Sequence, residues 1–263
     1  MAAEKHIALI TGGLSGIGLA AACQLAERGV SIAAVSSGAD HPDKAQAKNR
    51  IETLTAQHDA KALFLSIDIR EATSITEGVD AIAKTLGAVT VLINAAGTYH
   101  HEAIADHSLD GWADTIAVNL SGPFLMTRAC WPMMQKAQHG RIINIASTAA
   151  HRGMQEYAGY CSAKAGLLRL TQVTALEGAP YNITCNSISP SWVDTPMMAQ
   201  SLRQQAKARS VDVASLYDEA RRDSPQSRII SADEIARQIT WLALEAPLAL
   251  TGEDILMTGG ASW

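Results

Sequence analysis

Short apolar runs alternate with longer periodic segments along most of the chain. Each apolar run has the length of a strand and stays apolar at consecutive positions, which is typical of strands covered on both faces. These runs are 6–10, 31–35, 62–67, 89–93, 141–146, 182–188 and 254–258. Helical periodicity occupies the intervals near 17–28, 44–58, 71–85, 110–135, 157–178 and 231–245. Strands joined through helices of this length predict right-handed βαβ units, and therefore a doubly wound α/β fold whose parallel sheet carries helices on both faces.

One segment breaks this alternation. Residues 196–228 are polar and helix-forming, and they follow the sixth predicted strand. A connection this long inside an α/β unit is often functional, so we expect a substrate lid there. The 263 residues lie within the size range of one large domain, and we expect residues 1–263 to fold as a single domain.

Charge and composition narrow the class of partner. The net charge is −5 and no run of Lys and Arg is present, so a small molecule is favoured over nucleic acid or an anionic membrane. No apolar run approaches the ~20 residues of a membrane span, and the N-terminal residues lack a signal-peptide pattern. Four cysteines are scattered without metal-ligand spacing, at Cys23, Cys130, Cys161 and Cys185. We therefore expect a cytoplasmic protein with reduced thiols and no metal site.

A glycine-rich turn follows the first predicted strand. The sequence TGGLSGIG places Gly12, Gly16 and Gly18 between that strand and the first helix. Glycine lets the backbone turn sharply and approach a pyrophosphate, whose charge is favoured by free N–H groups at a helix N-terminus. The turn therefore predicts a dinucleotide site, and the alternative is a glycine turn that only permits tight packing.

A tyrosine and a lysine further along the chain add chemistry to this site. In YAGYCSAK, a helix would place Tyr160 and Lys164 on one face, whereas Tyr157 lies seven residues from the lysine. With this pair and the G-x-x-x-G-x-G spacing, the sequence resembles the short-chain dehydrogenase/reductase family over nearly its whole length. The resemblance implies a single-domain Rossmann-type fold, an NAD or NADP cofactor, and an oxidoreductase that interconverts a secondary alcohol and a ketone.

The resemblance also implies a catalytic tetrad, Asn119, Ser147, Tyr160 and Lys164. Tyr160 would exchange a proton with the substrate oxygen, and Ser147 would hydrogen-bond the same oxygen. Lys164 would bind the nicotinamide ribose, and Asn119 would hold a water. Half-ionising a free tyrosine at pH ~7 requires ~4 kcal/mol, and one positive charge ~4 Å away at an effective dielectric of ~20 supplies a similar amount. We therefore expect Lys164 to lower the pKa of Tyr160, although each residue taken singly also has an ordinary structural explanation.

The resemblance further implies the cofactor contacts, among them Asp68 at the adenine. Discrimination between NAD and NADP usually rests on an acid or an arginine after the second strand, where this chain has Ser36 and Ser37. Because no positively charged side chain is fixed there to pair with the 2′-phosphate of NADP, we favour NAD, although the side chain of Lys44 or His41 could reach that phosphate. The predicted cofactor set is Gly12, Ser15, Gly16, Ile17, Gly18, Ser36, Ser37, Asp68, Ile69, Asn94, Ala95, Gly97, Tyr160, Lys164, Pro190, Val193 and Thr195.

The substrate side is expected to be mostly apolar. Its predicted lining is Tyr99, Ala149, Met154, Tyr157, Trp192, Met197 and Met198. The motifs look nearest to 3-oxoacyl reductases and 3-hydroxybutyrate dehydrogenases, yet the polar residues by which hydroxybutyrate enzymes hold a carboxylate are not evident. We therefore favour an uncharged, largely apolar or aromatic ketone and its alcohol. The alternatives are a 3-oxoacyl (ACP or CoA) reductase, a hydroxyacid dehydrogenase and, less favoured, a non-catalytic dinucleotide sensor.

The resemblance also bears on assembly. Relatives bury the long helices that correspond to 110–135 and 157–178 against partner copies, which implies a homotetramer. The C-terminal Trp263 could reach a neighbouring copy.

The tyrosine pair yields a direct test. We predict that Tyr160→Phe abolishes turnover while cofactor binding is retained, because only the proton-transfer group is lost. Tyr157→Phe should instead change the preference among substrates, because this residue belongs to the pocket wall. Steady-state kinetics and cofactor titration of the two variants check this, and an equal loss of turnover in both would contradict the choice of Tyr160.

Overall fold

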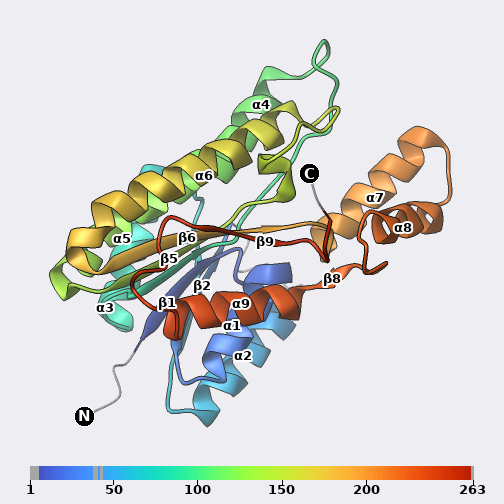
Figure 1. The fold of residues 1–263 in the computed structure, drawn as a ribbon. Helices are drawn as coiled ribbons and strands as arrows, with labels where there is room; N and C mark the ends of the chain where they lie inside the picture. Colours follow the sequence, from blue (N-terminus) through green and yellow to red (C-terminus); the bar gives the residue numbers. More distant parts are fainter. Residues whose placement is uncertain (1–5, 38–40, 42–43, 262–263) are drawn as a thin grey trace.

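Seven parallel strands form the central sheet of the protein (Figure 1). The computed structural model describes residues 6–37, 41 and 44–261. The strands are β1 (Ile7–Thr11), β2 (Ser31–Ser36), β3 (Ala62–Ser66), β4 (Val91–Asn94), β5 (Gly140–Ile145), β6 (Ile183–Pro190) and β9 (Asp254–Met257). Their order is β3-β2-β1-β4-β5-β6-β9, and every neighbouring pair is parallel. The strands predicted from the sequence and the doubly wound α/β class are confirmed.

Helices cover both faces of this sheet (Figure 1). On one face pack α1 (Gly16–Ala26), α2 (Ala45–Gln57) and α9 (Ala232–Leu244). On the other pack α3 (Ala72–Thr85), α5 (Gly122–Ala137) and α6 (Ala158–Gly178). From β1 the chain builds the sheet toward β3, and from β4 it builds the sheet in the other direction, toward β9. The connections that leave the carboxyl ends of β1 and β4 therefore run to opposite faces of the sheet. In sheets of this kind the resulting crevice is where ligands bind.

The predicted helix near 110–135 is not continuous. The structure divides it into α4 (Leu109–Ile116), a π-helical turn at Ala117–Ser121, and α5. At the end of this turn the N–H of Gly122 donates to the carbonyl of Ala117, five residues earlier. Pro123 follows at the start of α5 and has no N–H to donate back into the turn. A π-helical turn inserts an extra residue and shifts the helix face, and such turns often occur at functional sites.

The segment predicted as a lid consists of two helices, α7 (Pro196–Arg209) and α8 (Val213–Arg222). They pack on each other through their own small core, which includes Leu202 and Leu216. At their base, β7 (Val193–Asp194) pairs with β8 (Ile230–Ser231), which the sequence analysis missed because each strand has only two residues. Figure 1 shows this helix pair standing beyond the end of the sheet. The helical prediction is confirmed, and the lid function stays a prediction.

Several large apolar side chains lie on the outer surface. Those on α4, α5 and α6 are Leu109, Trp112, Phe124, Val173 and Leu176, and Leu176 is 77 % exposed. A second group comprises Trp241, Leu248 and Leu256 on and near α9 and β9. Trp263 lies outside the described residues. In the part of the chain that the structure describes, no helix has the length and apolarity of a membrane span, and no group of three or more His, Cys, Asp or Glu could hold a metal.

Candidate active site

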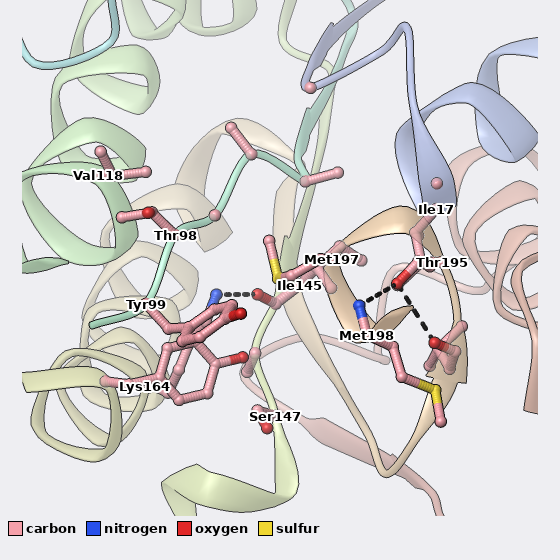
Figure 2. Close-up of a pocket in the computed structure, with 18 of the residues that line it drawn as sticks. Ile17, Thr98, Tyr99, Val118, Ile145, Ser147, Lys164, Thr195, Met197 and Met198 are labelled. Atoms are coloured by element: carbon pink, nitrogen blue, oxygen red, sulfur yellow. Dashed lines mark hydrogen bonds between the residues drawn. The ribbon is translucent and has the colours of Figure 1, made fainter. Parts of the chain in front are cut away.

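A cavity of about 580 Å³ opens at the carboxyl ends of the strands, where the loops after β1 to β6 meet α6 and α7. Figure 2 shows part of its wall, with Ile17, Thr98 and Val118 beside Ser147, Lys164, Thr195 and Met197. Most residues that the sequence analysis named lie on this wall, although they come from distant parts of the chain. Four do not line it: Gly18, Asn94, Asn119 and Ala149. Lys44 and His41 are not among the lining residues either.

The glycine turn is shaped by close backbone approach. Gly12 has φ +66° and Gly16 has φ +48°, a region that side-chain-bearing residues rarely adopt. A Cβ at Gly18 would strike the carbonyl oxygen of Gly12, so this glycine lets the turn fold against α1 without reaching the cavity. Ser15 precedes α1 and gives no side-chain cap, which leaves the first N–H groups of the helix available to an anion. The turn therefore fits the pyrophosphate of a dinucleotide.

Interior hydrogen bonds hold the neighbouring loops. The hydroxyl of Thr11 accepts hydrogen bonds from the N–H groups of Ala95 and Ala96, both at 3.1 Å. Asn94 donates from its side-chain amide to the Asn144 side-chain oxygen at 2.8 Å, within the sheet. These contacts explain the position of Asn94, which orders the loop after β4 from below and does not touch the cavity.

Asn119 lies in the π-helical turn and is fully buried. Its side-chain amide donates to the carbonyls of Thr98, at 2.7 Å, and Thr115, at 2.9 Å. Its side-chain oxygen accepts a hydrogen bond from the N–H of Thr98 at 3.4 Å. A Cβ at Gly97 would come within 3.1 Å of that oxygen, so glycine permits the approach. Asn119 therefore braces residues 97–98 against the helix.

Lys164 is buried, and its Nζ donates a hydrogen bond to the carbonyl of Ile145 at 2.7 Å (Figure 2). Nζ lies 5.7 Å from the centre of the Tyr160 ring, so the lysine and the tyrosine share one face of α6 as the sequence predicts. Burial lowers the pKa of Lys164 to about 8, because the apolar surroundings disfavour the ammonium form.

Tyr160 departs from one expectation. Burial raises its pKa, and the hydrogen bond with Ser147 opposes that rise only in part. The prediction of a lowered pKa for Tyr160 is therefore wrong for this structure, because the loss of hydration dominates. The Lys164 ammonium is engaged with the carbonyl of Ile145. Ser147 accepts a hydrogen bond from the N–H of Ala149 at 3.1 Å, which leaves its own hydrogen free to point toward Tyr160 or a ligand.

On the cavity wall an arginine that the sequence analysis missed joins two carboxylates. Arg70 contacts Asp68 at 2.7 Å and Asp114 at 2.9 Å, and Asp114 also lies 3.3 Å from His100. The hydrogen bond with Arg70 lowers the pKa of Asp68. Asp68 lines the cavity as predicted, but it shares its oxygens with this guanidinium. Nothing in the sequence distinguishes Arg70, because its partner Asp114 is distant in the chain.

The substrate side contains more polar groups than the sequence analysis predicted. Tyr99, Met154, Tyr157, Trp192, Met197 and Met198 line it as expected. Ala149, predicted with them, is buried behind the wall. Arg152, Ser201 and Asp223 line it as well, and the Trp192 indole N–H donates to Asp223 at 3.0 Å. Ser201 and Asp223 come from the two ends of the α7–α8 segment, so only the fold reveals them.

Comparison with known proteins gives consistent similarities. A family model described as enoyl-(acyl carrier protein) reductase matches residues 12–262. The D-beta-hydroxybutyrate dehydrogenase of Rhizobium meliloti is 33 % identical over 96 % of this chain and 97 % of its own length. The trans-4-hydroxycyclohexanecarboxylate dehydrogenase of Sinomonas cyclohexanicum is 33 % identical, over 98 % and 93 % respectively. Among solved structures, a variant of actinorhodin polyketide ketoreductase with NADPH superposes with a TM-score of 0.89 at 29 % identity, covering 97 % of each chain.

The buried lysine predicts a pH dependence of stability. A pKa near 8 in the folded protein, against 10.5 in the unfolded chain, means that the unfolded chain binds more protons between these values. The free energy of unfolding should therefore rise with pH across this window, by on the order of 3 kcal/mol relative to Lys164→Met. Urea unfolding of both proteins at several pH values checks this, since other titrating groups cancel in the difference. A difference that is flat or falls with pH would contradict it.

Proposed function

The chain belongs to the short-chain dehydrogenase/reductase family and is an NAD(P)-dependent oxidoreductase for hydroxyl and keto groups, and we propose that its substrate is uncharged and largely apolar or aromatic. The observation that carries this proposal is the wall around Tyr160 and Ser147, where Tyr99, Tyr157 and Met197 bring rings and a thioether to the cavity. An unpaired carboxylate placed against such a surface would lose hydration without compensation.

We assign the proton transfer to Tyr160. Its raised pKa keeps the phenol protonated at neutral pH, which suits donation of a proton to a ketone oxygen. Ser147 shares a hydrogen bond with Tyr160 and would hold the same oxygen. A bound nicotinamide would supply or accept the hydride. Lys164 keeps a positive charge below pH about 8, and Asn119 positions residues 97–98, so both act on the site without exchanging atoms with the substrate.

We further propose NAD as the preferred cofactor. Ser36 and Ser37 lie on the cavity wall after β2 and bring no charge to a 2′-phosphate. Arg70, a cation on the same half of the cavity, is already bound by Asp68 and Asp114. The solved ketoreductase with NADPH shows that a similar fold accommodates the phosphorylated cofactor, so the preference rests on these side chains and not on the fold.

A hydroxyacid substrate is the second candidate, and Arg152 is the observation that favours it. Arg152 lines the cavity and could face a carboxylate, a group that the substrates in the names of both curated relatives carry. Asp223 lines the same cavity and opposes an anion, which is why we place this candidate second. A non-catalytic sensor is disfavoured because Ser147, Tyr160 and Lys164 are all retained.

A small panel of substrates tests these assignments. We expect reduction of acetophenone with NADH, with a kcat/KM about a hundredfold above that for acetoacetate, because the carboxylate lacks a dedicated partner. NADPH should serve less well than NADH. Arg152→Met should leave acetophenone reduction nearly unchanged. A preference for acetoacetate that Arg152→Met removes would establish the hydroxyacid candidate instead, and tight cofactor binding without turnover would support the sensor.

We also propose that the chain forms a homotetramer in the cytoplasm. The apolar side chains on the outer faces of α4 to α6, with Phe124 49 % and Leu176 77 % exposed, would be covered by partner copies. All four cysteines are free, which agrees with a reducing compartment. Residues 196–228 would then act as the lid of each copy.

Light scattering tests the assembly. We expect a mass of four times the 27.8 kDa of one chain, and a smaller mass for Leu176→Lys, because a charge would be buried at the contact. The mass of a single chain for the natural sequence at micromolar concentration would contradict the proposal.

A further inference from the structure

A group of uncharged polar side chains lies on and directly behind the substrate wall of the cavity, which Tyr99, Tyr157 and Ser201 line. The Tyr157 hydroxyl and Ser201 Oγ are 3.3 Å apart, and the side-chain amide of Gln205 donates to both, at 3.3 and 3.1 Å. The Tyr99 hydroxyl donates a hydrogen bond to the Gln204 side-chain oxygen at 2.9 Å, and a hydrogen bond with Ser201 lowers its pKa against the rise caused by burial. We refer to Tyr99, Tyr157, Ser201 and Gln205 as the hydroxyl cluster.

Two members of the cluster are buried, whereas Tyr99 and Gln205 are partly exposed. Tyr157 is 8 % and Ser201 6 % exposed, and both line the cavity. On α7, Met198, Leu202 and Ala206 face the small core shared with α8, whereas Ser201 and Gln205, four residues apart, face α6. The side of α7 that meets Tyr157 therefore presents Ser201 and Gln205, of which Ser201 lines the cavity. Buried polar groups are costly unless they are hydrogen-bonded, so an apolar stripe would have packed there more simply.

The position of the cluster relates it to the reacting centre. Tyr157 caps the start of α6, Tyr160 lies in its first turn, and their ring centres are 6.4 Å apart. The Tyr99 and Tyr157 rings lie 6.0 Å apart on the same wall. A substrate whose carbonyl meets Tyr160 and Ser147 would therefore extend its far end past Tyr157 toward Ser201.

The chemistry of the cluster defines the group that it would bind. All four members are neutral, so a charged group would find no counter-ion among them. A hydroxyl can donate or accept, because its hydrogen rotates about the C–O bond. The hydroxyl cluster can therefore give up one of its internal hydrogen bonds and form one to a substrate oxygen, whether that oxygen donates or accepts the hydrogen.

From this geometry we propose that the hydroxyl cluster is a binding subsite for a second, uncharged oxygen of the substrate, remote from the carbon that is oxidised or reduced. The oxygen is a hydroxyl, carbonyl or ether. This inference rests on the proposed function, because it takes Tyr160 as the group that meets the reacting oxygen. It makes Ser201, which the sequence analysis did not name, a specificity-determining residue, and Gln205 a positioning residue that acts through Ser201 and Tyr157.

Two substrates of matched shape test the subsite. 4′-Hydroxyacetophenone and 4′-methylacetophenone differ by a hydroxyl against a methyl at the far end of the ring, and the phenol is neutral at pH about 6.5. We expect the natural protein to favour the hydroxyl compound about tenfold in kcat/KM, a preference that is modest because the cluster also satisfies itself without ligand. Ser201→Ala should reduce this ratio toward the intrinsic ratio of the two ketones, because the cluster loses its central hydroxyl.

The control is Ser215→Ala, the same change at an exposed serine of α8 whose hydroxyl bonds the carbonyl of Asp212. It should keep the ratio of the natural protein. Comparing ratios removes the electronic effect of the ring substituent, which is identical for every variant. A ratio unchanged by Ser201→Ala, or an equal loss for both ketones, would overturn the subsite, since a merely structural serine would affect both alike. Tyr157→Phe provides a second variant that keeps the ring and removes only its hydroxyl.

Binding measurements separate this inference from the proposed function. Calorimetry on the cofactor-bound Tyr160→Phe protein reports the affinity for each ketone without turnover. Tighter binding of the hydroxyl compound that is lost in Ser201→Ala would support the subsite, whether or not the natural protein reduces either ketone. Failure of the natural protein to reduce either ketone would refute the proposed function alone. Reduction of both ketones without any preference would refute the subsite alone.

Discussion

The buried ammonium of Lys164 is the constraint on which the site depends. A charged group in an apolar interior needs a hydrogen-bond acceptor, and this one finds the carbonyl of Ile145, at the end of β5. The bond ties one face of α6 to the end of the sheet. Tyr160 precedes the lysine by one helical turn and Ser147 follows Ile145 by two residues, so the same bond brings the tyrosine and the serine together. The positions of Tyr160 and Ser147 therefore follow from the hydrogen bond that stabilises the buried ammonium of Lys164.

A set of interior polar contacts gives the loops around this pair their shape. Thr11 holds the backbone after β4, Asn94 binds Asn144 across the sheet, and Asn119 binds the backbone at Thr98. Asn119 lies in the π-helical turn and donates both to this loop and to the carbonyl of Thr115, four residues earlier in the helix. These side chains shape the site without contacting a ligand, because they form hydrogen bonds with backbone groups of the loops that would otherwise be unpaired.

The substrate half has a different origin. It is assembled from α7, the loops after β4 and β5, and the start of α6, which are connected by side-chain hydrogen bonds and rings more than by the sheet. Two properties follow from this. The wall can vary in chemistry without disturbing the cofactor half, and its polar members, Ser201 and Gln205 among them, depend on how α7 lies against α6.

The sequence by itself determined where the strands of the central sheet lie along the chain, the parallel sheet, the glycine turn and the Tyr160–Lys164 pair, because these features arise from local periodicity and from residues a fixed number of positions apart. The interruption of the helix at Asn119 could not be predicted from the sequence, since a π-helical turn differs from an α-helical turn by only one inserted residue. The tertiary structure alone decided that burial raises the pKa of Tyr160, that Arg70 shares Asp68, and that Ala149 lies behind the pocket wall. These depend on desolvation and on contacts between residues far apart in the chain, which no short sequence pattern encodes.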